Sequence, residues 1–211
     1  LMNNSLANLL GLTEQELLEI ALENTSAMGF FEGYASESHF KKFVQTNPKI
    51  TNNYKPGDHN LVKKGDRVCV YQDTEITFEL KTIITDHSVS TRTIKKNIDV
   101  FGEVSYSGAF RTRGSRKRQI TFSDGSTIET YNNKRGQFDA FAVCVRPFTG
   151  KWEWMYCLES DIPSCNNSEL TPIQNAELLR PFVLVQWPPK DYWTDYLDEI
   201  LERACVNQPT V

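Results

Sequence analysis

The sequence lacks the features that mark several large classes of protein. No run of about 18 apolar residues occurs, so no membrane-spanning helix is predicted. The opening residues, LMNNSLANLL, contain neither a basic segment nor a small-residue cleavage site, so no signal peptide is expected. No glycine-rich phosphate loop of the Walker or dinucleotide type is present, which disfavours a nucleotide-dependent enzyme. Apolar residues make up 39% of the 211 residues, enough to form a core and to exclude a disordered chain.

Histidine and cysteine are few and scattered. The three histidines are isolated in sequence, which disfavours a two-histidine metal site or a Ser-His-Asp triad. The five cysteines are odd in number, and no two have the C-x-x-C spacing of a structural zinc site. We therefore expect buried, reduced thiols and a cytoplasmic location. The residues concerned are His39, His59, His87, Cys69, Cys144, Cys157, Cys165 and Cys205.

Charge is divided unevenly along the chain. The net charge is −4, but residues 81–151 hold 13 Lys and Arg against 6 Asp and Glu, a balance of +7. The remaining residues hold 10 basic and 21 acidic side chains, a balance of −11. The basic excess is densest over residues 111–118. A basic segment inside an acidic protein is typical of a binding surface for a polyanion, although a basic run can also be a solvated loop.

The order of elements predicts an α/β domain with a mixed central β-sheet flanked by helices. Thr13 and Glu16 form a capping box ahead of an apolar run, and Asp124-Gly125 between alternating apolar residues predicts a hairpin. A nearly continuous apolar run at 138–145 is typical of a central strand. The expected elements are helices at 14–23, 27–46 and 190–206, a long loop at 47–66, and strands at 67–71, 76–84, 119–122, 127–131, 138–145, 152–158 and 182–187.

The most informative segment is the predicted strand at 76–84. With a period of two, Phe78 and Leu80 point to a core, whereas Glu79 and Lys81 lie side by side on the opposite face. Charges on a half-buried strand are costly unless they are paired or used. The simplest alternative is an ordinary ion pair between these two side chains.

Hydrolysis of a phosphodiester gives such a pair of charges a chemical use. Mg²⁺ is held by one or two carboxylates together with water and phosphate oxygens, and it lowers the pKa of a bound water. Asp73 and Glu79 are the candidate carboxylates, and the carbonyl of Leu80 is a candidate further ligand. Lys81 would contact the attacking water and the scissile phosphate. The predicted cofactor is therefore Mg²⁺, with Mn²⁺ as a substitute.

The order and spacing of these acidic and basic side chains resemble the catalytic motif of the PD-(D/E)XK nuclease superfamily. The string FELKTI at 78–83, followed by Asp86 and Thr91, resembles more narrowly the MutH-like group of that superfamily. That group contains a mismatch-repair nicking enzyme and several type II restriction endonucleases. The resemblance implies a restriction-endonuclease-like fold and Mg²⁺-dependent hydrolysis of double-stranded DNA to 5′-phosphate and 3′-hydroxyl ends.

The resemblance also implies further site residues. Family members often carry a glutamate on a helix before the sheet, for which Glu32 is the candidate. Asp66, at the start of the preceding strand, is the alternative to Asp73 as the first metal carboxylate. Asp139 opens the central strand and is interpreted either as a structural carboxylate or as one that supports the metal ligands.

The chain is interpreted as a single endonuclease domain. Its parts are a helical N-terminal part at 1–50, a catalytic sheet at 66–160 that includes a basic β-hairpin arm at 105–137, and a C-terminal strand and helix at 180–211. Gly108 and Gly114 are expected to make the arm mobile, and a β-ribbon fits the major groove of DNA. The candidate DNA-binding residues are Arg111, Arg113, Arg116, Lys117, Arg118, Lys134, Arg135 and Gln137.

Three functions fit this pattern. The leading interpretation is a type II restriction endonuclease that acts on double-stranded DNA. A strand-nicking repair endonuclease of the same fold is the second, and it would need a partner to activate it. A non-catalytic DNA-binding module is the third, in which Glu79 and Lys81 form only a salt bridge. A monomer would cut the two strands in turn, whereas a homodimer would match a palindrome.

Overall fold

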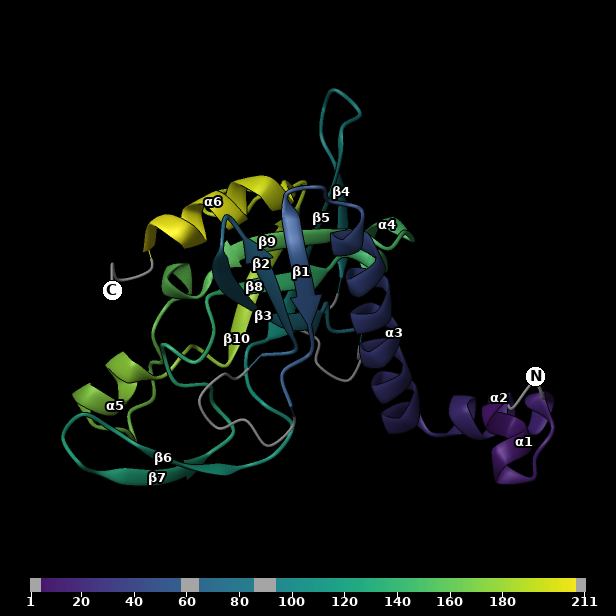
Figure 1. The fold of residues 1–211 in the computed structure, drawn as a ribbon, viewed down its shortest axis with the longest axis horizontal. Helices are drawn as coiled ribbons and strands as arrows, with labels where there is room; N and C mark the ends of the chain where they lie inside the picture. Colours follow the sequence, from purple (N-terminus) through teal and green to yellow (C-terminus); the bar gives the residue numbers. More distant parts are fainter. Residues whose placement is uncertain (1–4, 58–64, 86–93, 208–211) are drawn as a thin grey trace.

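A computed structural model describes residues 5–57, 65–85 and 94–207 of the chain (Figure 1). The helices are α1 (Leu6–Leu10), α2 (Glu14–Glu23), α3 (Thr25–Gln45), α4 (Arg146–Thr149), α5 (Pro172–Glu177) and α6 (Leu197–Asn207), with a 3₁₀ turn at Glu159–Asp161. The strands are β1 (Ile50–Tyr54), β2 (Arg67–Tyr71), β3 (Thr74–Thr82), β4 (Lys95–Ile98), β5 (Val104–Arg111), β6 (Arg118–Thr121), β7 (Thr127–Thr130), β8 (Ala140–Cys144), β9 (Trp154–Leu158) and β10 (Phe182–Trp187). His59, His87, Asp86 and Thr91 lie outside the described residues.

A five-stranded mixed sheet in the order β1-β2-β3-β8-β9 forms the centre of the molecule. Strand β3 pairs antiparallel with β2 and parallel with β8, so the predicted mixed sheet of an α/β fold is confirmed. A second sheet, in the order β10-β5-β4, is antiparallel throughout. Strands β6 and β7 form a separate hairpin.

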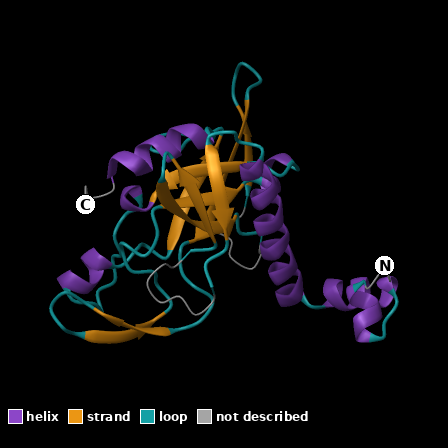
Figure 2. Cartoon of the chain, viewed as in Figure 1, coloured by secondary structure: helices purple, strands orange, loops and turns teal. Residues whose placement is uncertain are grey.

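Two apolar cores lie on the two faces of the main sheet. On one face, Phe40 of α3 and Ile200 of α6 pack with Phe78 of β3. On the other face, Phe110 of β5 packs with Phe141 of β8. The main sheet is therefore a middle layer between helices α3 and α6 on one side and the three-stranded sheet on the other, and Figure 2 shows the helices outside the strands.

This layering explains the patterns of β3 and β8. Every residue of β8 is buried, because Ala142 faces the helical core while Phe141 and its neighbour Val143 face the second sheet. Phe141 is paired in register with Glu79, and Val143 with Lys81. Because paired residues of neighbouring strands share a face, Glu79 and Lys81 lie on the face opposite the helical core, as the period of two predicts.

Local signals in the sequence are confirmed at two places. The backbone N–H of Glu16 donates to Oγ1 of Thr13 (3.1 Å), and the N–H of Thr13 donates to Oε2 of Glu16 (2.8 Å), so the capping box forms at the start of α2. In the β6-β7 hairpin, Asp124 accepts the N–H of Ser126 (2.9 Å), and Gly125 takes a φ of 81°. A positive φ is accessible to glycine without steric cost, which is why this turn forms here.

Two predicted elements are wrong in extent. The segment expected to be a loop at 47–66 contains β1, a partly exposed edge strand that pairs with β2. Its residues are mostly polar, so it lacks the apolar alternation that would identify a strand. The helix expected at 190–206 begins only at Leu197. Before it, Trp193 packs in the second core and Thr194 pairs with Tyr156 of β9, so tertiary contacts hold this segment out of the helix.

The predicted mobile arm at 105–137 also needs correction. Its first seven residues belong to β5, the middle strand of the second sheet, which the sequence pattern did not identify. Gly108 lies beneath the ring of Phe148, where an added Cβ would come within 3.0 Å of two ring carbons. Gly108 is therefore present for close packing and not for mobility. The β6-β7 hairpin, by contrast, forms as expected (Figure 1).

All five cysteines are free thiols, four of them buried, and Cys144 and Cys157 lie in β8 and β9 as expected. Within the described parts of the chain, no helix combines the length and apolar character needed to span a membrane.

Candidate active site

The pairing of β2 with β3 brings Asp66 to Glu79. The backbone N–H of Asp66 donates to the carbonyl of Phe78 (2.8 Å), and the Asp66 carboxylate accepts the backbone N–H of Leu80 (2.8 Å). Both contacts are made to β3 on either side of Glu79. Asp66, the alternative first carboxylate, is therefore fixed beside Glu79.

Lys81 pairs with Glu79 on the same face of β3. Their Nζ and Oε1 atoms lie 2.6 Å apart, and the side chains are only 19% and 14% exposed. A salt bridge this sheltered from water is more than a surface ion pair, because water screens it weakly. The sequence prediction that these two residues lie together is therefore met by the geometry.

The charges of this group shift each other's protonation. Burial and the neighbouring Glu79 carboxylate raise the pKa of Asp66 to about 7, against the opposing effect of Lys81. Burial acts to lower the pKa of Lys81, but the carboxylates of Glu79 and Asp66 outweigh it, so the pKa of Lys81 is raised. Lys81 therefore stays protonated at neutral pH, whereas the carboxyl group of Asp66 takes up a proton at about pH 7.

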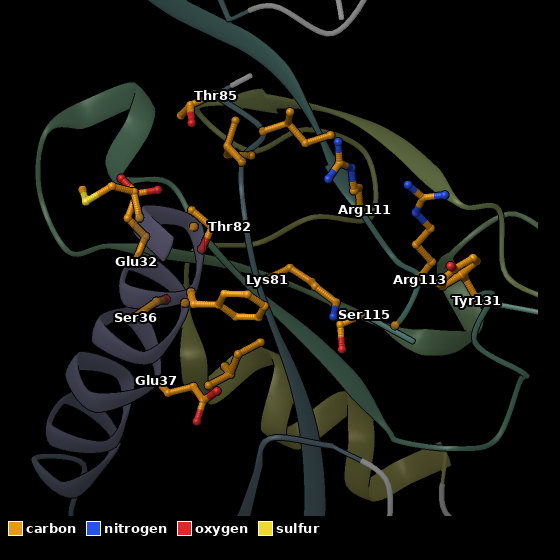
Figure 3. A pocket seen from close by; sticks show the side chains of 18 of the residues that line it. Glu32, Ser36, Glu37, Lys81, Thr82, Thr85, Arg111, Arg113, Ser115 and Tyr131 are labelled. Carbon is orange, nitrogen blue, oxygen red and sulfur yellow. The ribbon is translucent and has the colours of Figure 1, made fainter. Parts of the chain in front are cut away.

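A cleft of about 1180 Å³ opens above Lys81 (Figure 3). Glu32 and Glu37 of α3 line one side, and Arg111 and Arg113 line the other, with the Lys81 side chain extended between them. Glu32 and Glu37 both line this cleft from α3, although they point about 140° apart around the helix axis. The structure therefore brings Glu32, the glutamate suggested by the resemblance, into the same cleft as Lys81.

Asp73 is not part of this group, and its assignment as the first carboxylate is corrected. It lies in the turn between β2 and β3, with a φ of 60°, beside Lys49 and Glu202 in a separate small pocket. Six residues of extended chain, roughly 20 Å, separate Asp73 from Glu79. The short spacing in sequence that favoured Asp73 places it at the far end of the strand.

Asp139 and Glu37 have roles that the sequence left open or missed. One carboxylate oxygen of Asp139 accepts the backbone N–H of Thr77 (2.7 Å), which ties β8 to β3 and favours the structural interpretation. Glu37 forms an ion pair with Lys55 (2.8 Å), and its negative charge adds to the rise in the pKa of Asp66. That Glu37 lines the cleft, as the preceding Ser36 does, becomes visible only once α3 is placed against the sheet.

Four of the predicted DNA-binding residues keep their charges available. Arg113 lies over the rings of Tyr131 (5.7 Å) and Phe182 (5.4 Å), and Arg111 lies over Phe182 (6.0 Å). Within residues 94–207, no carboxylate lies within ion-pair distance of this group. Aromatic faces orient cations without neutralising them, so their N–H donors remain free for an anion. The group is Arg111, Arg113, Arg116 and Lys117.

Three others are engaged in internal contacts. Lys134 pairs with Glu177 (2.9 Å) and donates to the carbonyl of Thr121 (2.8 Å). Arg135 donates to the carbonyl of Ile162 (2.6 Å) and pairs with Glu159 (3.6 Å). These contacts fasten the hairpin region to α5 and to the segment before it, which favours a structural role for both residues over DNA binding. Gln137 accepts a hydrogen bond from Arg118 (2.9 Å).

Asp66 and Glu79 are the carboxylates beside Lys81 that are available to a divalent cation. In the segments that the structure describes, no group of three or more His, Cys, Asp and Glu side chains is arranged to hold a metal ion. Mg²⁺ needs only one or two carboxylates, because water and substrate phosphates complete its shell. Asp66 and Glu79 supply two, and burial together with the negative charge of Glu79 raises the pKa of Asp66. A cation between them would offset the repulsion between the two carboxylates, so the residues fit Mg²⁺.

No protein-family model, curated protein or solved structure matches this chain.

Proposed function

We propose that this chain is a Mg²⁺-dependent endonuclease of double-stranded DNA, of the type II restriction kind. The observation that carries the proposal is the convergence of Asp66, Glu79 and Lys81 beside a cleft whose other wall carries Arg111 and Arg113. Two carboxylates and an ammonium group serve metal-assisted hydrolysis, and unpaired arginines serve a phosphate backbone. The resemblance of the FELKTI string to the MutH-like nucleases agrees with this assignment.

Each side chain then has a defined task. Asp66 and Glu79 would hold the cation, with the carbonyl of Leu80 as a further oxygen donor. When bound, Mg²⁺ supplies charge neutralisation at the phosphate and a lowered pKa for water. Lys81 donates hydrogen bonds to the attacking water and to a non-bridging phosphate oxygen, which orients the first and stabilises charge on the second. Glu32 faces the cleft from α3 and would accept a hydrogen bond from water.

The products and the assembly follow from the same proposal. Water attacks phosphorus, the bond between phosphorus and the 3′ oxygen breaks, and the 3′ oxygen takes up a proton as water loses one, which leaves 5′-phosphate and 3′-hydroxyl ends. Cleavage of both strands at a palindrome requires either two events by one chain or a two-fold homodimer. A strand-nicking repair enzyme would share the site and differ in that it cuts one strand of the duplex and not both.

Incubation of the purified chain alone with supercoiled plasmid tests the proposal. Discrete linear fragments with Mg²⁺ or Mn²⁺, and none with EDTA, support a restriction endonuclease. Slow nicking without linear product favours the repair enzyme instead. Binding without any cleavage in either metal would leave only a DNA-binding module and would refute the proposed activity.

A further inference from the structure

Arg118, the first residue of β6, is held by two neutral side chains. Its Nη2 donates to Oδ1 of Asn133 and to Oε1 of Gln137 (2.9 Å). Asn133 is itself buried and donates to the carbonyl of Thr112 (2.6 Å), so its amide is fixed. Because both acceptors are uncharged amides, they orient the guanidinium group and leave its charge intact.

The rest of the guanidinium group lacks partners. Its Nε is buried and has no hydrogen-bond acceptor among the described residues. In that same part of the chain no carboxylate forms an ion pair with Arg118, in contrast to Arg135, which pairs with Glu159. A partly buried cation without an anion is costly to the free protein. Burial accordingly lowers the pKa of Arg118.

Arg118 borders the candidate active site. Its charge interacts with those of Glu79 and Lys81. Gly114 lines the cleft, and a Cβ added there would lie 3.6 Å from Nη1 of Arg118, so Nη1 lies close to the wall of the cleft. Within the described residues Nη1 makes no hydrogen bond, whereas Nη2 is held by the two amides and Nε is buried. Nη1 is therefore the unused donor of a cation next to the proposed catalytic pair.

We propose that Arg118 binds the reacting phosphate group and is a further catalytic residue, preset by Asn133 and Gln137. This inference rests on the proposed function, because it assigns the phosphate to a phosphodiester. Nη1 can donate a charge-assisted hydrogen bond to a phosphate oxygen, while Asn133 and Gln137 keep the guanidinium plane in place through Nη2. Arg118 stays protonated throughout and moves no proton. It offsets the negative charge that grows on the phosphate oxygens as water attacks.

The first test separates catalysis from binding. Single-turnover cleavage at saturating DNA, and DNA affinity in EDTA, are measured for Arg118→Met and for Arg180→Met. Arg180 is exposed and belongs neither to the lining of the cleft nor to the proposed DNA-binding residues, so it is the matched control. We expect Arg118→Met to lower the rate by about 100-fold or more while the Kd changes about threefold or less. Arg180→Met should keep both the rate and the affinity.

Arg118→Lys guards against a folding defect, because it keeps the charge and loses the planar group that Asn133 and Gln137 hold. Its rate should fall by about tenfold or more, with an unchanged circular dichroism spectrum. Wild-type rates in both Arg118 variants would overturn the inference, and so would a loss of affinity alone.

A second measurement does not depend on DNA cleavage. The melting temperature of the wild type in EDTA should rise with millimolar inorganic phosphate, and that rise should be lost in Arg118→Met but kept in Arg180→Met. If the plasmid is never cut yet this difference appears, the endonuclease proposal fails and the anion site stands. If the plasmid is cut but Arg118→Met behaves as wild type in both measurements, only the role of Arg118 is refuted.

Discussion

The carboxylate of Asp66 accepts the backbone N–H of Leu80 at 2.8 Å, and so the start of β2 is fastened to the middle of the Glu79-Leu80-Lys81 tripeptide. This contact places a second carboxylate beside Glu79 although 12 residues of sequence lie between Asp66 and Glu79. It also distinguishes two aspartates that the sequence alone left as alternatives.

The first prediction concerns those two aspartates. Asp66→Asn keeps an oxygen that can accept the Leu80 N–H but removes a metal-binding charge, so cleavage should fall by about 100-fold or more. Asp73→Asn, at the far turn, should cleave at close to the wild-type rate. Metal-dependent plasmid cleavage by the two variants checks this. Loss of activity in Asp73→Asn with retention in Asp66→Asn would reverse the assignment.

Stability of the metal-free protein should depend on the protonation of Asp66. Its pKa is raised from 3.8 to about 7 on folding, so the folded state binds this proton more tightly than the unfolded state does. The resulting stabilisation is fully present below about pH 4 and is lost as the pH rises through about 7. In EDTA, the melting temperature of the wild type should therefore fall between pH 5 and pH 8 by more than that of Asp66→Asn.

Added Mg²⁺ is the control for this pH effect. At pH 8 the cation should raise the melting temperature of the wild type, since it replaces the missing proton, and should do so less for Asp66→Asn. Equal pH dependence in both proteins would show that Asp66 titrates normally.

Free and engaged basic residues should behave differently on substitution. Arg111→Ala and Arg113→Ala should each weaken DNA binding and reduce the slope of log affinity against log salt by about one. Lys134→Ala and Arg135→Ala should lower the melting temperature, because they remove contacts to Glu177 and Ile162, and leave that slope unchanged. Affinity measured over a salt series, together with thermal unfolding, tests the distinction. The opposite pattern would return DNA binding to Lys134 and Arg135.

The last of the stability predictions concerns Gly108. Gly108→Ala would drive a methyl group to 3.0 Å from the ring of Phe148, so we expect a loss of about 1–3 kcal/mol in the free energy of unfolding. Gly29→Ala is the matched control, because Gly29 lies in α3 with open space around it, and it should stabilise by about 0.5–1 kcal/mol. Denaturant unfolding measures both. An unchanged midpoint for Gly108→Ala would contradict the close packing of β5.

Where the sequence predicted structure well, local chemistry was sufficient. The capping box of Thr13, the Asp124-Gly125 turn and the doubly buried run of β8 each depend on neighbouring residues or on burial of whole segments. The sequence did not predict strand β1, because it lies at the sheet edge and its mostly polar residues give no sign of its pairing with β2. The start of α6 was misplaced because Trp193 is held in a distant core.

In the candidate site too, the local sequence pattern predicted some contacts, whereas others depended on tertiary pairing. Period two along β3 was enough to place Glu79 beside Lys81. The choice of Asp66 over Asp73 required the pairing of β2 with β3, which only the three-dimensional structure supplies. Likewise, the charge of a basic residue says nothing about its partner. Arg135 and Arg113 look alike in sequence, yet one fastens a loop and the other lies on aromatic rings at the cleft.

The role of Lys81 provides the most direct test of the account. Lys81→Ala and the wild type are compared for cleavage of supercoiled plasmid in Mg²⁺ and for affinity to a DNA duplex in EDTA. The account predicts that the variant loses cleavage by about 100-fold or more and keeps its DNA affinity within about threefold. Cleavage by Lys81→Ala at the wild-type rate would show that Glu79 and Lys81 form only an ion pair, and the proposed activity would then be contradicted.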